Sequence, residues 1–495
     1  MSEIGLNGKI YNAILSLYLN PRSRVVLNGF ETEYFACPVG VKQGDCLSPT
    51  LFAIFINDLA TQVKETGLGI KLDCGRDQLL PLVVGILLYA DDIVCLAENE
   101  DDLQFMLYLI EKWCEKWRLD VNMSKTNIMH VRNKRRQQSK FTFFFSRQPV
   151  QYCKSYEYLG VNIDEHLSFK FSVDKHSDAA ERALSGVITK MIKNGGFPYS
   201  VYSTLYRSCV LSVSDYSSAV TGFEEYSSSV KLQLRAIRAF LGLPKSAPNY
   251  GVLSECDWLI PKFRTRIIMV RYYHRLLNLD ESRVAKGVFL WDKQLNEQNI
   301  ISTWYNEVKT IFNECDLDLL FDMGLNFDKK FTVSYIESKY VAYQSRILSE
   351  ECNLLPKLRT FVLFKDFQNP ASYIGKPLNF YSRRQMAKLR LGCLPLRLET
   401  GRYAVPRVPE HQRICLVNQE CTSHGEVESE SYFLFFCEAY QNERDKWFKA
   451  MTLPNDFNTF DVSAKLKIIL NEPCNIKPTA LFLSNSLSIR ANTLS

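Results

Sequence analysis

Two adjacent aspartates, in the sequence Tyr89-Ala90-Asp91-Asp92, constrain this chain more than any other feature. They stand between two apolar runs, residues 79–88 and 93–97, and this pattern predicts two strands joined by a tight turn. Like charges a few ångströms apart cost on the order of several kcal/mol outside bulk water. A divalent cation removes that cost, so the pair is a candidate metal site. An exposed Asp-Asp turn is the common structural alternative.

Composition narrows the class of protein. The chain has 495 residues and is 46% hydrophobic, which suffices for roughly two to four domains with sizeable cores. Its net charge of +6 is compatible with a polyanionic partner but carries little weight alone. Fifteen scattered cysteines form no dense disulfide framework, and no apolar run reaches the ~18 residues of a membrane span. We therefore expect a nuclear or cytoplasmic protein in a reducing compartment, neither secreted nor transmembrane.

The pattern of elements predicts an α+β fold at the N-terminus. Helical periodicity at residues 9–19 is followed by a hairpin with an Asn28-Gly29 turn. Ser48 is a good N-cap for the next helix, with Pro49 as its first residue. The strand–turn–strand unit at residues 79–97 and an amphipathic helix at 100–118 complete a mostly antiparallel sheet covered by helices. Helical patterns dominate after about residue 165, with a second boundary near 250.

Three further segments have both a functional and a structural interpretation. Gln43 and Gly44 lie in a loop that leads into a helix N-terminus, a plausible phosphate or nucleobase platform, although a simple capped helix start is favoured. Lys125 follows a short strand and could reach a phosphate, but unaided it is a surface lysine. Leu159 and Gly160 belong to a strand in which the glycine allows close backbone approach.

Taken together, these pieces resemble the reverse transcriptases of non-LTR (LINE-type) retrotransposons. The family's loop–helix motif matches residues 40–52, and its catalytic hairpin matches Tyr89-Ala90-Asp91-Asp92. Residues 122–126 match its lysine motif and Tyr158-Leu159-Gly160 its primer-grip motif. The resemblance is dense over residues 1 to about 165.

The resemblance implies a right-hand polymerase fold. Residues 1–164 would form the palm and part of the fingers, 165–250 a thumb-like helical region, and 251–495 a mostly α-helical C-terminal region. Asp91 and Asp92 would be catalytic and would help to hold two Mg²⁺ ions. The partners would be an RNA template, a DNA primer and dNTPs, with no membrane.

The resemblance also suggests roles for the other motif residues. Gln43 and Gly44 would line the templating base and the incoming nucleotide, and Lys125 would lie near the triphosphate. Leu159 and Gly160 would help to position the primer end.

One family motif has no match in this sequence. In the family a further metal-binding aspartate, in a Phe/Tyr-x-Asp context, lies on a strand before the helix at residues 9–19. Asp45 is the first aspartate here, and Glu3 is the only acidic residue before Glu31. The chain thus resembles an N-terminally truncated element or a partial gene model, and we expect it not to extend a primer alone. A catalytically dead remnant that holds RNA or an RNA–DNA duplex is the alternative, and a relic without a selected role is a third.

Two more features remain. Cys415, Cys421, His424 and Cys437 have the spacing C-x₅-C-x₂-H-x₁₂-C within residues 413–444, which resemble the zinc-knuckle-like segment of LINE-type proteins. Because Asn418 and Tyr432 replace two expected ligands, we expect a degenerate remnant without zinc rather than an intact site. The basic run at residues 132–140 is either a nuclear-localisation or nucleic-acid patch or a solvated loop.

Overall fold

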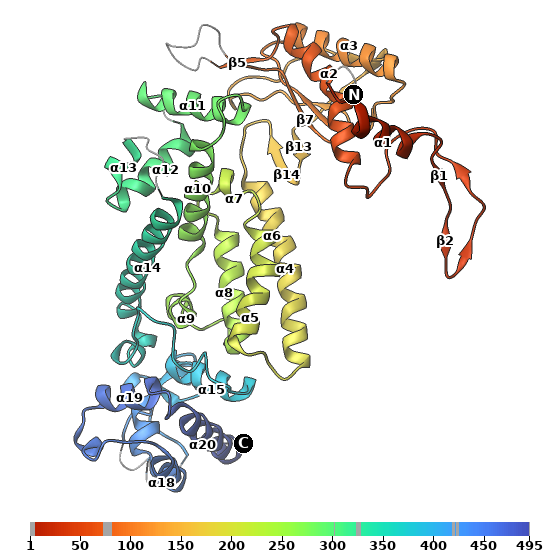
Figure 1. Cartoon of the computed structure of the whole chain (residues 1–495). Coiled ribbons are helices and arrows are strands. Elements are labelled where there is room, and N and C mark those ends of the chain that lie inside the picture. Colours follow the sequence, from red (N-terminus) through yellow and green to blue (C-terminus); the bar gives the residue numbers. More distant parts are fainter. Residues whose placement is uncertain are drawn as a thin grey trace. The chain divides into compact units, whose positions relative to one another are not determined.

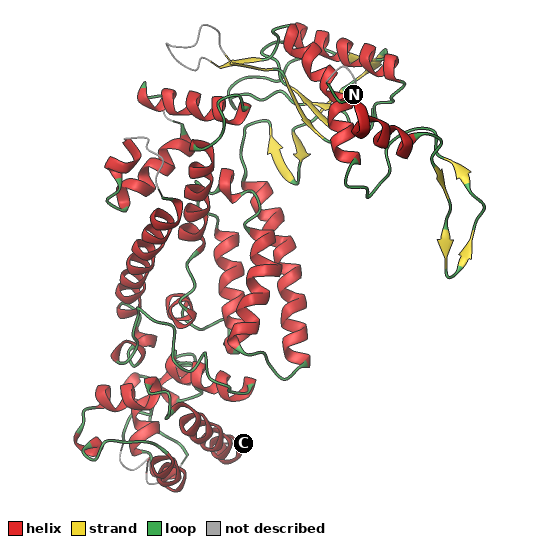
Figure 2. Cartoon of the chain, viewed as in Figure 1, coloured by secondary structure: helices red, strands yellow, loops and turns green. Residues whose placement is uncertain are grey.

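The computed structural model describes residues 5–72, 82–300, 302–322, 328–417, 421 and 425–494. The chain divides into two compact units. The first combines Met1–Tyr156 with Asp280–Gln298, and the second combines Glu157–Leu279 with Asn299–Ser495. Among the described residues every named strand lies at or before Asp164, as Figures 1 and 2 show.

Helices and short strand pairs alternate in the first unit. Its helices are α1 (Gly8–Tyr18), α2 (Ser48–Glu65), α3 (Glu100–Trp117) and α11 (Val284–Glu297). Its strands before α3 are β1 (Arg22–Ser23), β2 (Val26–Leu27), β3 (Phe30–Glu31), β4 (Phe35–Ala36), β5 (Ile70–Leu72), β6 (Leu82–Val84), β7 (Ile86–Tyr89) and β8 (Asp92–Cys95). Those after α3 are β9 (Asn127–Ile128), β10 (Phe144–Phe145), β11 (Gln148–Pro149) and β12 (Gln151–Tyr152). The strands form separate pairs, antiparallel except for the parallel β9–β12 pair.

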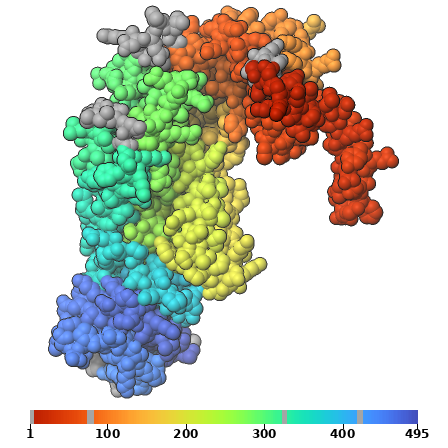
Figure 3. Space-filling view, viewed as in Figure 1, coloured from red at the N-terminus to blue at the C-terminus, as the bar shows by residue number. Residues whose placement is uncertain are grey.

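The hairpin predicted around Asn28-Gly29 is present. Val26 pairs with Glu31 and Leu27 with Phe30, so Asn28 and Gly29 form a two-residue turn. Both have positive φ, 51° and 85°, which is the geometry that favours Asn-Gly. The residues of strands β1–β4 are exposed on both faces, and Figure 3 shows this red segment projecting from its unit.

The apolar run before the two aspartates is a bent strand. Gly85 separates β6, which pairs with β5, from β7, which pairs with β8. A Cβ at position 85 would lie 2.4 Å from the carbonyl oxygen of Leu68, so only glycine allows this close approach. Residues 79–81 of the predicted run lie outside the described part of the chain.

Helices α2 and α3 pack around an aromatic core. Trp113 is 3% exposed, and its indole Nε1 donates a hydrogen bond of 2.7 Å to Asp58 Oδ1 on α2. Trp117 Nε1 donates to the other oxygen of the same carboxylate at 3.2 Å. The Asn99 side chain caps α3 by accepting from the backbone N–H of Asp102. This core supports β7 and β8, whose inward residues pack against it.

The predicted cap of α2 is wrong in one detail. Leu47, not Ser48, occupies the N-cap position, and Ser48 is already the first helical residue. The Ser48 hydroxyl instead donates a 2.6 Å hydrogen bond to the carbonyl of Lys42, because the preceding loop folds back over the helix start.

Helices dominate the described residues of the second unit. The hairpin of β13 (Ser155–Tyr158) and β14 (Val161–Asp164) spans its beginning, since the unit starts at Glu157. Its longer helices are α4 (Lys170–Lys193), α8 (Ser227–Leu241), α9 (Asn249–Cys256), α10 (Pro261–Leu277), α12 (Thr303–Glu314), α14 (Lys329–Asn353), α15 (Phe380–Arg390), α18 (Gln441–Ala450), α19 (Val462–Asn471) and α20 (Ile476–Leu494). Its largest core brings α8 and α9 together with α15 and α20. None of the described helices combines the length and the apolar character that crossing a membrane requires.

Candidate functional site

The two aspartates lie at the tip of the β7–β8 hairpin. Tyr89 pairs with Asp92, which leaves Ala90 and Asp91 as a two-residue turn, and Ala90 has a φ of +51°. Both carboxylates are exposed. Behind the tip, Ile86 pairs with Cys95, and burial raises the pKa of the Cys95 thiol to about 12. The hairpin is therefore anchored at its base and presents two carboxylates to solvent at its tip.

The donor atoms at this tip suit magnesium, which prefers carboxylate oxygen. Asp91 and Asp92 supply two such groups from adjacent positions. A metal is usually shared by three or more His, Cys, Asp or Glu side chains. In the described part of the chain, the donor atoms of Cys415, Cys421 and Cys437 lie close enough together to form such a group. The described residues thus place no third such ligand beside the two aspartates.

The loop before α2 carries Gln43 and Gly44. Gly44 has a φ of +84°, and Gln43 and Gly44 are both exposed. The loop is closed by the Ser48 hydroxyl on the Lys42 carbonyl at 2.6 Å and by the Leu47 N–H on Asp45 Oδ1 at 3.1 Å. These bonds hold Gln43 and Gly44 at an outward turn, at the N-terminal end of a helix, where backbone N–H groups favour anions.

Lys125 lies in a turn organised by Asn122. The Asn122 side chain accepts from the backbone N–H of Ser124 at 3.1 Å, and its carbonyl accepts from the Lys125 N–H at 3.0 Å. Tyr156 Oη donates to the Lys125 carbonyl at 3.3 Å. The turn therefore fixes the backbone of Lys125 and leaves its ammonium group exposed.

Leu159 and Gly160 form the tip of the β13–β14 hairpin in the second unit. Both have positive φ, 50° and 77°. Tyr216 Oη donates to the Leu159 carbonyl at 2.8 Å, and His176 Nε2 is 2.9 Å from the Gly160 carbonyl. The His176 and Tyr216 rings also meet edge to face, with centroids 5.3 Å apart. These two residues hold the turn by both of its carbonyl groups.

His176 and Tyr216 are positioning residues that sequence reasoning missed. They are 16 and 57 residues from the carbonyls that they hold, and His176 lies on α4. No local pattern links them to the Leu159–Gly160 turn, so a sequence signal for them would have to come from covariation.

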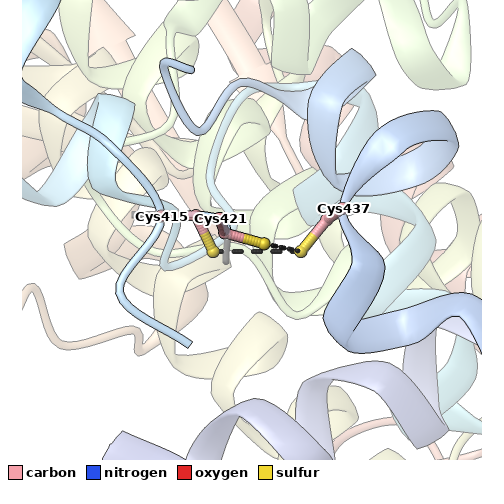
Figure 4. Close-up of side chains that lie close together, drawn as sticks. All are labelled: Cys415, Cys421 and Cys437. Carbon is pink, nitrogen blue, oxygen red and sulfur yellow. Dashed lines mark hydrogen bonds between the residues drawn. The ribbon is translucent and has the colours of Figure 1, made fainter. Parts of the chain in front are cut away.

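Three cysteines of the C-terminal segment come together in a buried cluster, which Figure 4 shows. Cys437 Sγ lies 3.8 Å from Cys415 Sγ and 3.6 Å from Cys421 Sγ, and all three side chains are 0% exposed. Tetrahedral zinc with Zn–S bonds of about 2.3 Å places its sulfur ligands about 3.8 Å apart. The three thiols therefore match three corners of a zinc site, whereas the fourth predicted ligand, His424, lies outside the described residues.

Hydrogen bonding within the cluster shifts the pKa values of two of the thiols in opposite directions. The contact with Cys437 lowers the pKa of Cys415, and the same contact, together with burial, raises the pKa of Cys437. Tyr432 stands at the position where the family pattern has histidine, and burial followed by a hydrogen bond with Cys421 raises its pKa. A neutral phenol is a poor zinc ligand, so Tyr432 closes the cluster without completing the donor set.

Known proteins resemble this chain over part of its length. The family described as reverse transcriptase (RNA-dependent DNA polymerase) matches residues 3–163. An RNA-directed DNA polymerase from mobile element jockey of Drosophila funebris is 26% identical over 295 residues, which are 57% of this chain and 30% of the relative. The jockey polymerase of Drosophila melanogaster is 22% identical over 56% of the chain and 30% of the relative. The Pol polyprotein of the type-1 retrotransposable element R2 from Popillia japonica is 27% identical over 21% of the chain and 16% of the relative. The chain thus spans about 30% of the length of the jockey relatives.

Proposed function

Since the chain belongs to the reverse transcriptases of non-LTR retrotransposons, we propose that its first unit serves RNA-templated addition of dNTPs to a primer 3′-hydroxyl. The observation that carries this proposal is the β7–β8 hairpin. It presents Asp91 and Asp92 at adjacent positions, both exposed, at a tight turn inside the segment that matches the family.

Asp91 and Asp92 are the groups that would hold magnesium. Two Mg²⁺ ions at such a site supply activation of the primer hydroxyl and neutralisation of the leaving pyrophosphate. The remaining roles belong to the protein's own side chains. Gln43 and Gly44 contact the templating base and incoming nucleotide, and Lys125 contacts the triphosphate. Leu159 and Gly160 position the primer end, in the turn held by Tyr216.

A polypeptide of these 495 residues alone is proposed to bind a primed template without extending it. Within these 495 residues the first aspartate is Asp45, so Asp91 and Asp92 are the two carboxylates of this polypeptide that match the family's metal-binding motifs. Loss of one carboxylate from a two-metal clamp removes on the order of several kcal/mol of transition-state stabilisation. The alternative function, a catalytically dead module that holds RNA or an RNA–DNA duplex, shares the binding but not the chemistry.

Primer extension with the purified chain tests the proposed binding and the proposed inactivity. Wild type, Asp91→Asn and Asp101→Asn are each incubated with a DNA-primed RNA template, dNTPs and Mg²⁺, while fluorescence anisotropy follows binding. Asp101 is an exposed carboxylate in the first turn of α3 and serves as the matched control. We expect binding by all three proteins and extension by none. Extension by wild type and Asp101→Asn, lost in Asp91→Asn, would overturn the proposed inactivity and establish the polymerase, whereas failure of wild type to bind would overturn both functions.

The sequence favours a remnant without zinc, but the sulfur separations of the buried cysteine cluster fit three corners of a tetrahedral site, so zinc is proposed here in place of that expectation. Cys415, Cys421 and Cys437 would hold the ion and would gain folding energy from it. Metal analysis of the full chain tests this assignment. We expect one zinc per chain in wild type and in Cys209→Ser, whose thiol is exposed, and loss of zinc in Cys437→Ser. Zinc at trace levels in wild type would leave a metal-free thiol cluster.

A further inference from the structure

A loop in the first unit carries five cationic side chains and no acidic one. We call residues 130–140 the basic loop, and its sequence is His-Val-Arg-Asn-Lys-Arg-Arg-Gln-Gln-Ser-Lys. It connects β9 to the segment that leads into β10. None of the roles assigned above uses this loop.

The loop is closed at its base by its own polar groups. The backbone N–H of Ser139 donates to His130 Nδ1 at 3.0 Å. Arg132 turns inward, so that its Nη1 donates to the His130 carbonyl and its Nε to the Arg136 carbonyl, each at 3.1 Å. Arg132 is therefore a structural cation that ties the two arms of the loop together.

Asn133 fixes the tip of the loop. Its side-chain oxygen accepts from the Arg135 N–H at 3.1 Å, and its carbonyl accepts from the Arg136 N–H at 2.9 Å. The backbone that carries Lys134, Arg135 and Arg136 is thus held in one turn before any ligand arrives. Preorganisation of this kind reduces the entropy that binding must offset.

The three tip cations are free to take an anionic ligand. Lys134, Arg135 and Arg136 are all exposed, and their side chains make no ion pair with any described carboxylate. The acidic group that the loop does contact, Glu100, accepts a hydrogen bond from Ser139 at the base, which lowers its pKa. The tip, residues 133–137, offers no apolar side chain. Protein partners are usually anchored by buried aromatic or apolar groups, so a tip of this composition fits a polyanion better than a protein surface.

We propose that the basic loop binds the phosphodiester backbone of a nucleic-acid strand through Lys134, Arg135 and Arg136, without reading its sequence. Contacts of this type hold a strand in position and carry no base information. The proposal rests on the proposed function only in assuming that the protein meets nucleic acid. An RNA single strand and an RNA–DNA duplex present the same chemistry, and the test distinguishes them.

The salt dependence of binding measures the number of phosphates contacted. Affinity of the full chain for a 20-nucleotide oligouridine RNA and for an RNA–DNA duplex of equal length is measured across salt concentrations. The test variant replaces Lys134, Arg135 and Arg136 by Gln. Loss of three phosphate contacts flattens the slope of log K against log salt by about 2 for a single strand and about 3 for a duplex. The substrate whose slope falls by the full amount expected for it, about 2 for the single strand or about 3 for the duplex, is the one that the loop holds.

A matched control replaces three lysines that already pair with carboxylates. Lys112, Lys175 and Lys339 lie 2.7, 2.6 and 2.9 Å from Glu115, Glu157 and Asp316. We expect their Gln variant to keep the wild-type slope. A second variant, Asn133→Ala, keeps every charge but loosens the tip, and should keep the slope while weakening binding at fixed salt by roughly fivefold, the effect of one hydrogen bond.

The outcomes separate this proposal from the proposed function. If wild type binds a primed template and the triple tip variant keeps the wild-type slope on both substrates, the basic loop proposal fails and the proposed function stands. If wild type binds neither substrate, both fail. If the control variant flattens the slope as much as the tip variant, the effect is one of net charge and the site is refuted.

Discussion

The turn that holds Leu159 and Gly160 predicts a large effect from a single methyl group. Gly160 has a φ of +77°, and left-handed backbone of this kind costs a residue with a Cβ roughly 1–2 kcal/mol. The new Cβ of Gly160→Ala would also lie 3.3 Å from Tyr216 Cε1, so the tyrosine ring would have to move by a few tenths of an ångström. That movement strains the 2.8 Å hydrogen bond from Tyr216 to the Leu159 carbonyl, which is worth about 1 kcal/mol.

The two terms together come to about 2 kcal/mol, or roughly a 30-fold shift in the population of the native turn. We expect Gly160→Ala to lower the free energy of unfolding by about this amount. Tyr216→Phe keeps the ring and removes only the hydroxyl, so its cost should be about 1 kcal/mol.

A matched control is available on α4. Gly186 is a helical glycine with open space at its Cβ position, so Gly186→Ala should raise the free energy of unfolding by about 0.5–1 kcal/mol. The same substitution, glycine to alanine, should therefore lower the free energy of unfolding at position 160 and raise it at position 186.

The assay combines urea unfolding with binding of two nucleic acids. A primed template with a recessed 3′ end tests the primer-positioning role, and the unprimed RNA strand serves as the reference. We expect Gly160→Ala to weaken binding of the primed template selectively. Unchanged unfolding in Gly160→Ala would refute the argument from φ and the Tyr216 contact. Normal primed-template binding by a measurably destabilised variant would refute the primer-positioning role alone.

Other predictions concern the supports of the site. Asp58→Ala should destabilise the first unit by about 1–3 kcal/mol, because the buried Trp113 indole N–H loses its acceptor. Urea unfolding measures this loss. A change below about 0.5 kcal/mol would show that water replaces the carboxylate. Cys95 should resist alkylation by iodoacetamide at pH 8 while exposed Cys46 reacts, since the thiolate is the nucleophile and burial raises the pKa of Cys95 to about 12. Peptide mass spectrometry measures the labelling of each cysteine. Equal labelling of both would mean that the β7–β8 hairpin opens readily. Lowering the pH should release zinc from the cysteine cluster, because its thiolates must be deprotonated to bind metal; retention of zinc at pH 4 would contradict thiolate ligation.

Much of the site follows from short stretches of sequence. The Asn28-Gly29 hairpin and the Asp91-Asp92 turn depend on backbone preferences over a few residues. The stripe on α3 that places Trp113 in the core depends on helical periodicity, which the sequence displays directly. These elements could be predicted because the interactions that define them lie within a turn or two of the chain.

The tertiary structure decided what the motifs contact. Asp58 accepts from two indoles more than 50 residues away, and Tyr216 reaches the Leu159 carbonyl across 57 residues. Residues of α11 join the first unit although most of its sequence lies before residue 157, and Gly287 there leaves no room for a Cβ beside Leu82. Such contacts depend on which surfaces pack together, and a single sequence holds no local signal for that choice.

The same distinction between local sequence signals and tertiary contacts applies to the two carboxylates and to the basic loop. Sequence alone identified Asp91-Asp92 as a candidate metal site and residues 132–140 as basic, because charge and turn signals are local properties. Only the folded chain distinguished Arg132, whose guanidinium closes the loop, from Lys134, Arg135 and Arg136, which face solvent. The physical reason is that a side chain's partner is set by distance in space, and distance in space is fixed only when the chain has packed.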